Sequence, residues 1–192
     1  MYEPAESNQT KLPNKRKFAK TFRILSRISY WIHLILGVVS GLTLLLVTFS
    51  RGATRSGSLG GGVGIFIAVF SLIALAFRVY WAWRYRKLAK KLERVNPDAQ
   101  PSRAEIIQVL RIGLFVSLVG LLLALIASEI SLISLVAGAI ARPQGVAVYE
   151  REQVIKIADL LLILAQFNIL GAHFFGMANS LGLLNWISKE EI

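Results

Sequence analysis

The chain alternates between long apolar stretches and short basic segments. Four apolar stretches are long enough to cross a bilayer as helices, and they lie at about 30–49, 59–80, 110–135 and 158–187. A hydrocarbon core of about 30 Å needs about 20 helical residues. A buried helix of a soluble protein rarely needs so long a run without a charge. The pattern therefore predicts an all-α membrane protein, a bundle of four transmembrane helices that fills residues 30–187.

The two ends of the chain have a different character. Residues 1–14, with two prolines and two asparagines, predict a disordered tail. Residues 15–29 mix basic and apolar positions and predict a basic amphipathic helix that lies on the membrane surface. Residues 188–192 form a short tail.

The segment between the second and third apolar stretches is basic. The second stretch ends against Arg78, and a basic helix then leads into a cytoplasmic loop at 84–103. Ser102 and Glu105 have the spacing of a capping box, which predicts that the third helix starts near Arg103. This loop is interpreted either as a solvated hairpin that faces lipid or as a docking surface for RNA or protein. Its basic residues are Arg84, Arg86, Lys87, Lys90 and Lys91.

Composition narrows the class of protein. Hydrophobic residues make up 55% of the chain, far more than a soluble domain of this size needs. The net charge of +11 is therefore attributed to contact with anionic lipid headgroups, and no nucleic-acid partner is expected. The chain has no cysteine, which excludes disulfides and thiolate ligands. No catalytic motif is present, so we expect no enzyme and no resident cofactor.

The basic residues also predict the orientation in the membrane. Segments on one side of the four stretches contain 17 Lys and Arg, and segments on the other side contain 5. The positive-inside rule then places both termini and the central loop in the cytoplasm. All four tryptophans fall at the same predicted side, where amphipathic rings prefer the headgroup zone. They are Trp31, Trp81, Trp83 and Trp186.

The fourth apolar stretch contains a polar stripe with a spacing of seven residues. The stripe consists of Asp159, Gln166, His173 and Ser180. Seven residues are close to two helical turns, so these side chains share one face, and polar groups must avoid lipid.

Two further polar residues extend the stripe to other spans. Glu129 and Asp159 fall near the outer ends of their spans, and His33 and His173 lie toward the cytoplasmic side. Outer carboxylates and inner imidazoles are typical of a path for a divalent cation. The alternative is structural, because the same groups serve equally as hydrogen-bond partners between helices.

Three segments give the chain a family resemblance. Ser-Tyr-Trp-Ile-His at 29–33, the segment 101–113 and the segment 173–184 resemble a family of cyanobacterial and plastid membrane proteins with four spans. Its plastid members are inner-envelope proteins described both as a translocon component and as a permease in chloroplasts. The resemblance implies a role in iron passage or in a preprotein translocation complex. It also implies polar residues at Asp159, Asn168 and His173.

The polar stripe of the fourth stretch and the family resemblance together favour a permease, or a permease component, for a divalent metal. Ferrous iron is the expected transported ion. The residues expected to line its route are His173, Asp159, Asn168, His33, Gln166 and Glu129. His173 and Asp159 are the candidate metal ligands. The alternative is a non-transporting subunit of a translocation or assembly complex, with the basic loop as its docking surface.

The surroundings of the protein follow from the same features. Small residues four apart favour close helix packing, and four spans hardly enclose a wide pathway alone. We therefore expect a homo-oligomer or a place in a larger membrane complex, in contact with lipid. No transit peptide is apparent, which favours a cyanobacterial plasma or thylakoid membrane over a plant inner envelope.

Overall fold

Four long helices form the whole of the architecture that the structure describes. This computed structural model describes residues 15–53, 59–92, 101–140 and 157–189. The predicted tail at 1–14, the end of the chain beyond 189 and the loop residues 93–100 lie outside these ranges. The helices are α1 (Lys15–Ala53), α2 (Leu59–Leu92), α3 (Arg103–Ile140) and α4 (Ile157–Lys189).

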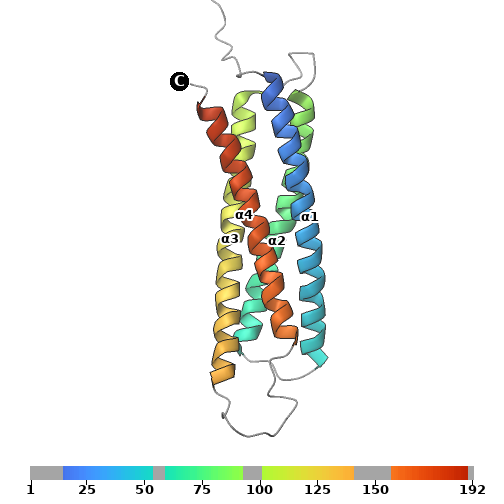
Figure 1. Cartoon of the computed structure of the whole chain (residues 1–192), viewed down its shortest axis with the longest axis vertical. Coiled ribbons are helices and arrows are strands. Elements are labelled where there is room, and N and C mark those ends of the chain that lie inside the picture. The colour runs from blue at the N-terminus through green and yellow to red at the C-terminus, as the bar shows by residue number, and fades with distance from the viewer. Residues whose placement is uncertain (1–14, 54–58, 93–100, 141–156, 190–192) are drawn as a thin grey trace, which may run out of the picture.

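The helices lie side by side along the long axis of the molecule (Figure 1). Each helix packs against its neighbours in chain order, α4 closes the ring against α1, and α2 and α4 also touch across the centre. All four are long and apolar enough to cross a membrane. The chain is an integral membrane protein with the predicted four-helix fold.

α1 begins and α4 ends at the same end of the bundle, as four spans require (Figure 1). We refer to it as the basic end, because Arg84, Arg86 and Lys87 lie in the last turns of α2 there, and to the opposite end as the far end. The side of the membrane that the basic end faces stays a prediction.

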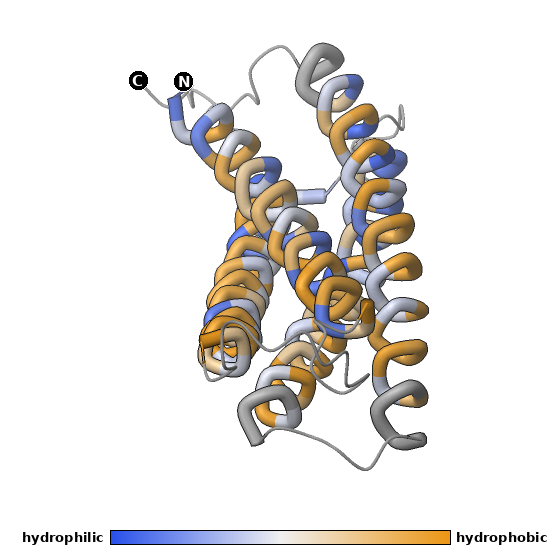
Figure 2. The backbone as a smooth tube through the Cα atoms, turned by 60° about the horizontal axis from the view of Figure 1, so that its bottom comes forward, coloured by the Kyte–Doolittle hydropathy of each residue, from blue (hydrophilic) through white to orange (hydrophobic). Residues whose placement is uncertain are grey.

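Buried positions recur at alternating intervals of three and four residues. On α2 they include Gly64, Ala68, Ser71, Leu75, Arg78, Ala82, Tyr85 and Ala89. Alternating intervals of three and four residues are typical of helices that pack lengthwise in left-handed bundles. The opposite faces expose large apolar side chains, such as Leu46 at 66% and Phe115 at 66%. Most of the length of each helix is apolar, and hydrophilic residues gather toward the end that holds the two termini (Figure 2).

Two apolar cores occupy the two ends of the interior. The basic-end core is built largely from bulky and aromatic side chains: Phe22, Trp81, Tyr85, Leu88, Ala89, Ile106, Val109, Leu110, Leu183 and Ile187. The far-end core is aliphatic and rich in alanine: Leu44, Val47, Ala68, Leu75, Ala124, Ala127, Leu162, Ala165, Ile169 and Ala172.

The amphipathic segment 15–29 is placed differently from the sequence expectation. It continues α1 without a break, and Ala19 and Phe22 are buried in the bundle rather than in the membrane surface. The reason is the spacing, because Phe22, Ser26 and Ser29 extend the series of inward positions that leads to His33. The face of the segment that contains Ala19 and Phe22 therefore meets other helices, whereas Ile24 and Ile28 are exposed.

The predicted start of α3 is correct. The backbone N–H of Glu105 donates to Ser102 Oγ at 3.2 Å, and the N–H of Ile106 donates to the Ser102 carbonyl at 3.2 Å. Ser102 thus caps the helix that begins at Arg103.

Candidate functional site: a buried polar layer

A set of polar side chains lies between the two apolar cores and reaches into both of them. All four helices contribute to it, and we define the polar layer as His33, Ser71, Arg78, Tyr85, Ser117, His173 and Ser180, all buried. His33, Arg78 and His173 are each 0% exposed. Ionisable groups inside a membrane helix are costly, so they point to a functional site or to a specific structural role.

Arg78 ties the layer together. Its Nη2 donates to the Gly176 carbonyl at 2.8 Å and to Ser180 Oγ at 2.7 Å. Its Nη1 donates to Tyr85 Oη at 3.1 Å, and the guanidinium carbon lies 5.2 Å from the centre of the Tyr85 ring. These partners from α2 and α4 are neutral, so the guanidinium charge is solvated by dipoles and a π face rather than by a carboxylate.

Each histidine has one ring nitrogen fixed by a backbone carbonyl. His33 Nδ1 meets the carbonyl of Ser29, and His173 Nε2 lies 3.2 Å from the carbonyl of Ser71. A carbonyl only accepts, so the nitrogen that faces it carries the proton. In the neutral rings the lone pairs are then on His33 Nε2 and His173 Nδ1. Both atoms are buried without a hydrogen-bond partner in the described chain.

Three unpartnered polar atoms converge on Gly176. A Cβ at this position would lie 2.6 Å from Ser117 Oγ, 2.7 Å from His33 Nε2 and 2.8 Å from Arg78 Nε. Two atoms at such distances from one point are at most 5.5 Å apart. None of the three has a hydrogen-bond partner among the described residues. A neutral imidazole nitrogen accepts, a guanidinium N–H donates and a hydroxyl does both, which are the partners that a buried water needs.

Two further glycines make room for the layer. A Cβ at Gly120 would overlap the ring of His173, and a Cβ at Gly113 would overlap the Tyr85 hydroxyl and Arg78 Nη1. Ser71 Oγ also donates to the Gly120 carbonyl at 2.9 Å. Glycine is required at these places because the polar side chains occupy the space of a Cβ.

The structure brings only some of the sequence candidates together. His33 on α1 and His173 on α4 belong to the same layer, where His33 packs on Gly176, one helical turn beyond His173. Gln166 is buried nearer the far end and donates to Ser131 Oγ at 2.9 Å. Asn168 is half-buried, two residues from Gln166.

The two candidate carboxylates lie elsewhere. Asp159 is half-buried in the first turn of α4, and Glu129 is exposed on α3. Fourteen residues separate Asp159 from His173, which is about 21 Å of helix. Within the described parts of the chain, no three His, Asp or Glu side chains gather as a metal site would need. The two carboxylates therefore lie at a distance from the histidines, and the path from outer carboxylates to inner imidazoles stays a prediction.

Sequence reasoning missed the central residue of the layer. The sequence predicts Arg78 as the charge that ends the second apolar stretch, but the structure buries this residue inside the bundle, where it is 0% exposed. A signal was present, because Ser71, Arg78 and Tyr85 repeat at intervals of seven as the polar residues of α4 do.

The basic residues of α2 beyond the layer are partly held by aromatic rings. Arg84 lies 4.7 Å from the centre of the Trp81 ring, Arg86 lies 5.1 Å from that of Tyr30, and Lys87 Nζ lies 3.4 Å from that of Trp83. Lys90 and Lys91 are exposed. Cation–π contacts of this kind fix the charges at the basic end while leaving them accessible.

Comparison with known proteins adds a family and a relative. Residues 12–188 match the family described as "Protein of unknown function (DUF3611)". The chain is 30% identical over 178 residues to "Protein TIC 21, chloroplastic" of Arabidopsis thaliana, a match that covers 90% of this chain and 58% of the relative. The chain thus spans less than two thirds of that relative. No solved structure matches it.

Proposed function

The chain belongs to the DUF3611 family, and we propose that it is a permease, or a permease component, for a divalent metal ion, with ferrous iron as the first candidate. The ligands proposed inside the bundle are His33 and His173. The family resemblance supports the same class of function.

The proposal rests on the hydrogen bonding of the two imidazoles. In each ring one nitrogen meets a backbone carbonyl, and the other has no partner among the described residues. Histidines that bind metals usually donate their second ring nitrogen to a carbonyl or carboxylate, which orients the ring and fixes the tautomer. His33 and His173 each have this second contact, with the carbonyls of Ser29 and Ser71. Each then presents a buried lone pair, and imidazole nitrogen is a suitable ligand for iron.

Arg78 limits how tightly such an ion is held. Arg78 Nε and His33 Nε2 both lie beside Gly176. The fixed positive charge of the guanidinium at this short distance repels a dication bound to His33. A permeating ion must also leave its site, so weak binding is compatible with transport. The layer is 0% exposed at both histidines, so further ligands come from Ser117 or water rather than from a second copy of the chain.

Iron uptake into liposomes tests the proposal. Purified protein is expected to raise ferrous iron flux above that of empty vesicles. The double variant His33→Gln, His173→Gln is expected to lose at least about tenfold, the effect of removing essential ligands. Glu105→Gln is the control, because Glu105 is exposed at the start of α3 and is not among the residues expected to line the route, and its flux is expected to stay unchanged. Wild-type flux equal to that of empty vesicles, with helical content intact, would contradict the proposal.

A second candidate is a non-transporting subunit of a translocation or assembly complex. It is favoured by the hydrogen bonds of Arg78 to Tyr85, Gly176 and Ser180, which describe an interior built to hold helices together. In this case the exposed bases of α2 dock a soluble partner. Neutralising Lys87, Lys90 and Lys91 would then abolish partner binding and leave iron flux at the level of empty vesicles.

Assembly is a separate part of the proposal. The wide apolar outer surface of the helices accommodates either neighbouring copies or other membrane proteins. We propose a homo-oligomer or a larger complex in a cyanobacterial plasma or thylakoid membrane. Light scattering of the purified protein, corrected for detergent, measures the oligomeric state. A monodisperse monomer that transports iron would overturn the proposed assembly.

A further inference from the structure

A groove opens between the outer sides of α3 and α4 at the basic end. It has a volume of about 810 Å³, and its lining includes Arg103, Ile107 and Arg111 of α3 and Leu181, Gly182 and Asn185 of α4. None of these residues belongs to the polar layer, so the groove is a separate site.

We propose that this groove binds one anionic phospholipid. The phosphate lies between Arg103 and Arg111, and an acyl chain lies over Gly182 and Leu181. Basic pockets between membrane helices are known to bind anionic headgroups.

The positive charges of two arginines support the binding of an anionic headgroup in the groove. Arg103 and Arg111 are two helical turns apart, about 12 Å along α3, and among the residues that the structure describes the lining of the groove contains no Asp or Glu. Arg103 Nη2 donates to the Ile187 carbonyl at 2.8 Å, which fixes this guanidinium at the edge of the groove. Arg111 is exposed and free to turn toward a phosphate.

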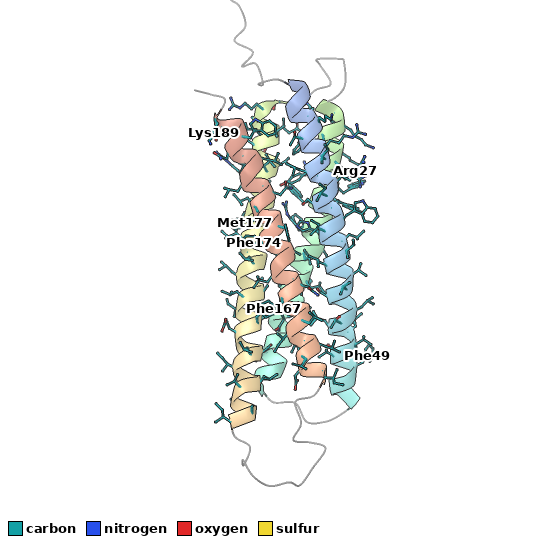
Figure 3. All side chains as sticks on the ribbon, in the orientation of Figure 1. Arg27, Phe49, Phe167, Phe174, Met177 and Lys189 are labelled. Carbon is teal, nitrogen blue, oxygen red and sulfur yellow. The ribbon has the colours of Figure 1, made fainter. Side chains whose placement is uncertain are left out.

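Shape supports an acyl chain beside it. A Cβ at Gly182 would meet nothing within 4 Å, so the floor of the groove is open. One turn deeper on the same two faces come Phe115 and Phe174, which are 66% and 52% exposed. Figure 3 shows Phe174 on α4, near the middle of the bundle. These rings extend the apolar surface of the groove toward the membrane interior.

The groove also lies at the depth of a headgroup. Trp186 of α4 is half-buried and lies between Asn185 and Ile187 in the sequence, both of which line the groove. Tryptophans mark the boundary between headgroups and hydrocarbon. A free phosphate ion would use the arginines alone, whereas a phospholipid uses the arginines and the apolar floor together.

Native mass spectrometry of the full chain in detergent tests the site. The protein is titrated with phosphatidylglycerol and phosphatidylcholine of identical acyl chains, and preferential retention of phosphatidylglycerol is expected. Arg111→Gln is expected to weaken phosphatidylglycerol binding about fivefold, the usual effect of one basic residue at an anionic surface, and to leave phosphatidylcholine unchanged. Gly182→Leu fills the floor and is expected to weaken both lipids.

Two matched variants separate this site from diffuse attraction. Arg27→Gln removes an exposed charge at the same end but on α1 (Figure 3), and Gly171→Leu adds the same side chain to α4 at another open position. Neither is expected to change binding, and circular dichroism verifies the fold of each variant. Equal retention of the two lipids, an Arg27→Gln effect as large as that of Arg111→Gln, or no effect of Gly182→Leu would overturn the proposal.

Discussion

At the basic end and in the adjoining polar layer, helices meet through directional hydrogen bonds, whereas at the far end small residues bring backbones close together. Trp81 donates to Val109, Arg78 to Gly176 and Ser180, and Arg103 to Ile187. In the far-end core, alanines of α2, α3 and α4 pack against one another.

The difference matters because lipid is as apolar as the side chains of the helices. Without a hydrophobic driving force, close packing and hydrogen bonds have to select the neighbours of each helix. Alanine packing allows small displacements along a neighbour, but a guanidinium with fixed partners on α2 and α4 sets one register. The polar half therefore specifies the arrangement, and the apolar half completes it.

The largest loss of stability is expected when a new side chain fills the space that the polar layer occupies. Gly120→Ala places a Cβ inside the His173 ring, so we expect the free energy of unfolding to fall by about 3 kcal/mol, at the upper end of overpacking effects. Gly171→Ala is the control on α4, where a Cβ meets nothing within 4 Å, and it is expected to stabilise by about 0.5–1 kcal/mol. Unfolding by sodium dodecyl sulfate, followed by circular dichroism, measures both. Similar values for the two variants would show that the layer tolerates displacement.

The second-largest loss of stability is expected at Arg78, whose guanidinium donates hydrogen bonds to residues of α2 and α4. Lysine keeps the charge but cannot reach Tyr85 and Ser180 together, so Arg78→Lys is expected to cost about 2 kcal/mol of unfolding free energy, the scale of hydrogen bonds to charged groups. Arg84→Lys keeps the same chemistry on the exposed side and should change little. If both substitutions cost the same, the charge rather than the geometry of Arg78 holds the helices.

A smaller loss is expected at the far end. Gln166→Leu removes one hydrogen bond to Ser131, and hydrogen bonds between membrane helices contribute about 0.6 kcal/mol on average. The same denaturant titration measures this change. A loss as large as that of Arg78→Lys would remove the distinction between the two halves.

The smallest effect belongs to Glu129. Its side chain is exposed, so Glu129→Gln is expected to change the unfolding free energy by less than about 0.5 kcal/mol, as surface substitutions usually do. A larger change would place this carboxylate in the interior, where the sequence first suggested it.

The sequence predicts the fold well because lipid enforces a simple rule. A backbone in hydrocarbon satisfies its own hydrogen bonds most simply as a helix, so four long apolar stretches sufficed to define four spans. The family resemblance from three segments is confirmed by the match over residues 12–188. The stripe on α4 also directed attention to His173 and Ser180, which lie in the polar layer.

The site is harder to predict because it combines residues from four helices. A charge inside an apolar stretch looks like its end, and Arg78 was interpreted in that way. Asp159 shares the seven-residue spacing of His173, but the spacing gives a face and not a depth at which partners meet. The roles of Gly113, Gly120 and Gly176 depend on side chains of other helices, which no local pattern contains.

The lengths of the helices have a mechanical consequence. α1 and α3 contain 39 and 38 residues, so each is about 57 Å long, whereas a bilayer with its headgroups measures about 40–45 Å. A tilt of about 20° shortens such a rod only to about 54 Å. The bundle therefore stands out of the membrane as a stiff pedestal. Within the described residues, each helix runs without a break from the basic end to the level of Arg78, so a force applied at that end is expected to reach the polar layer.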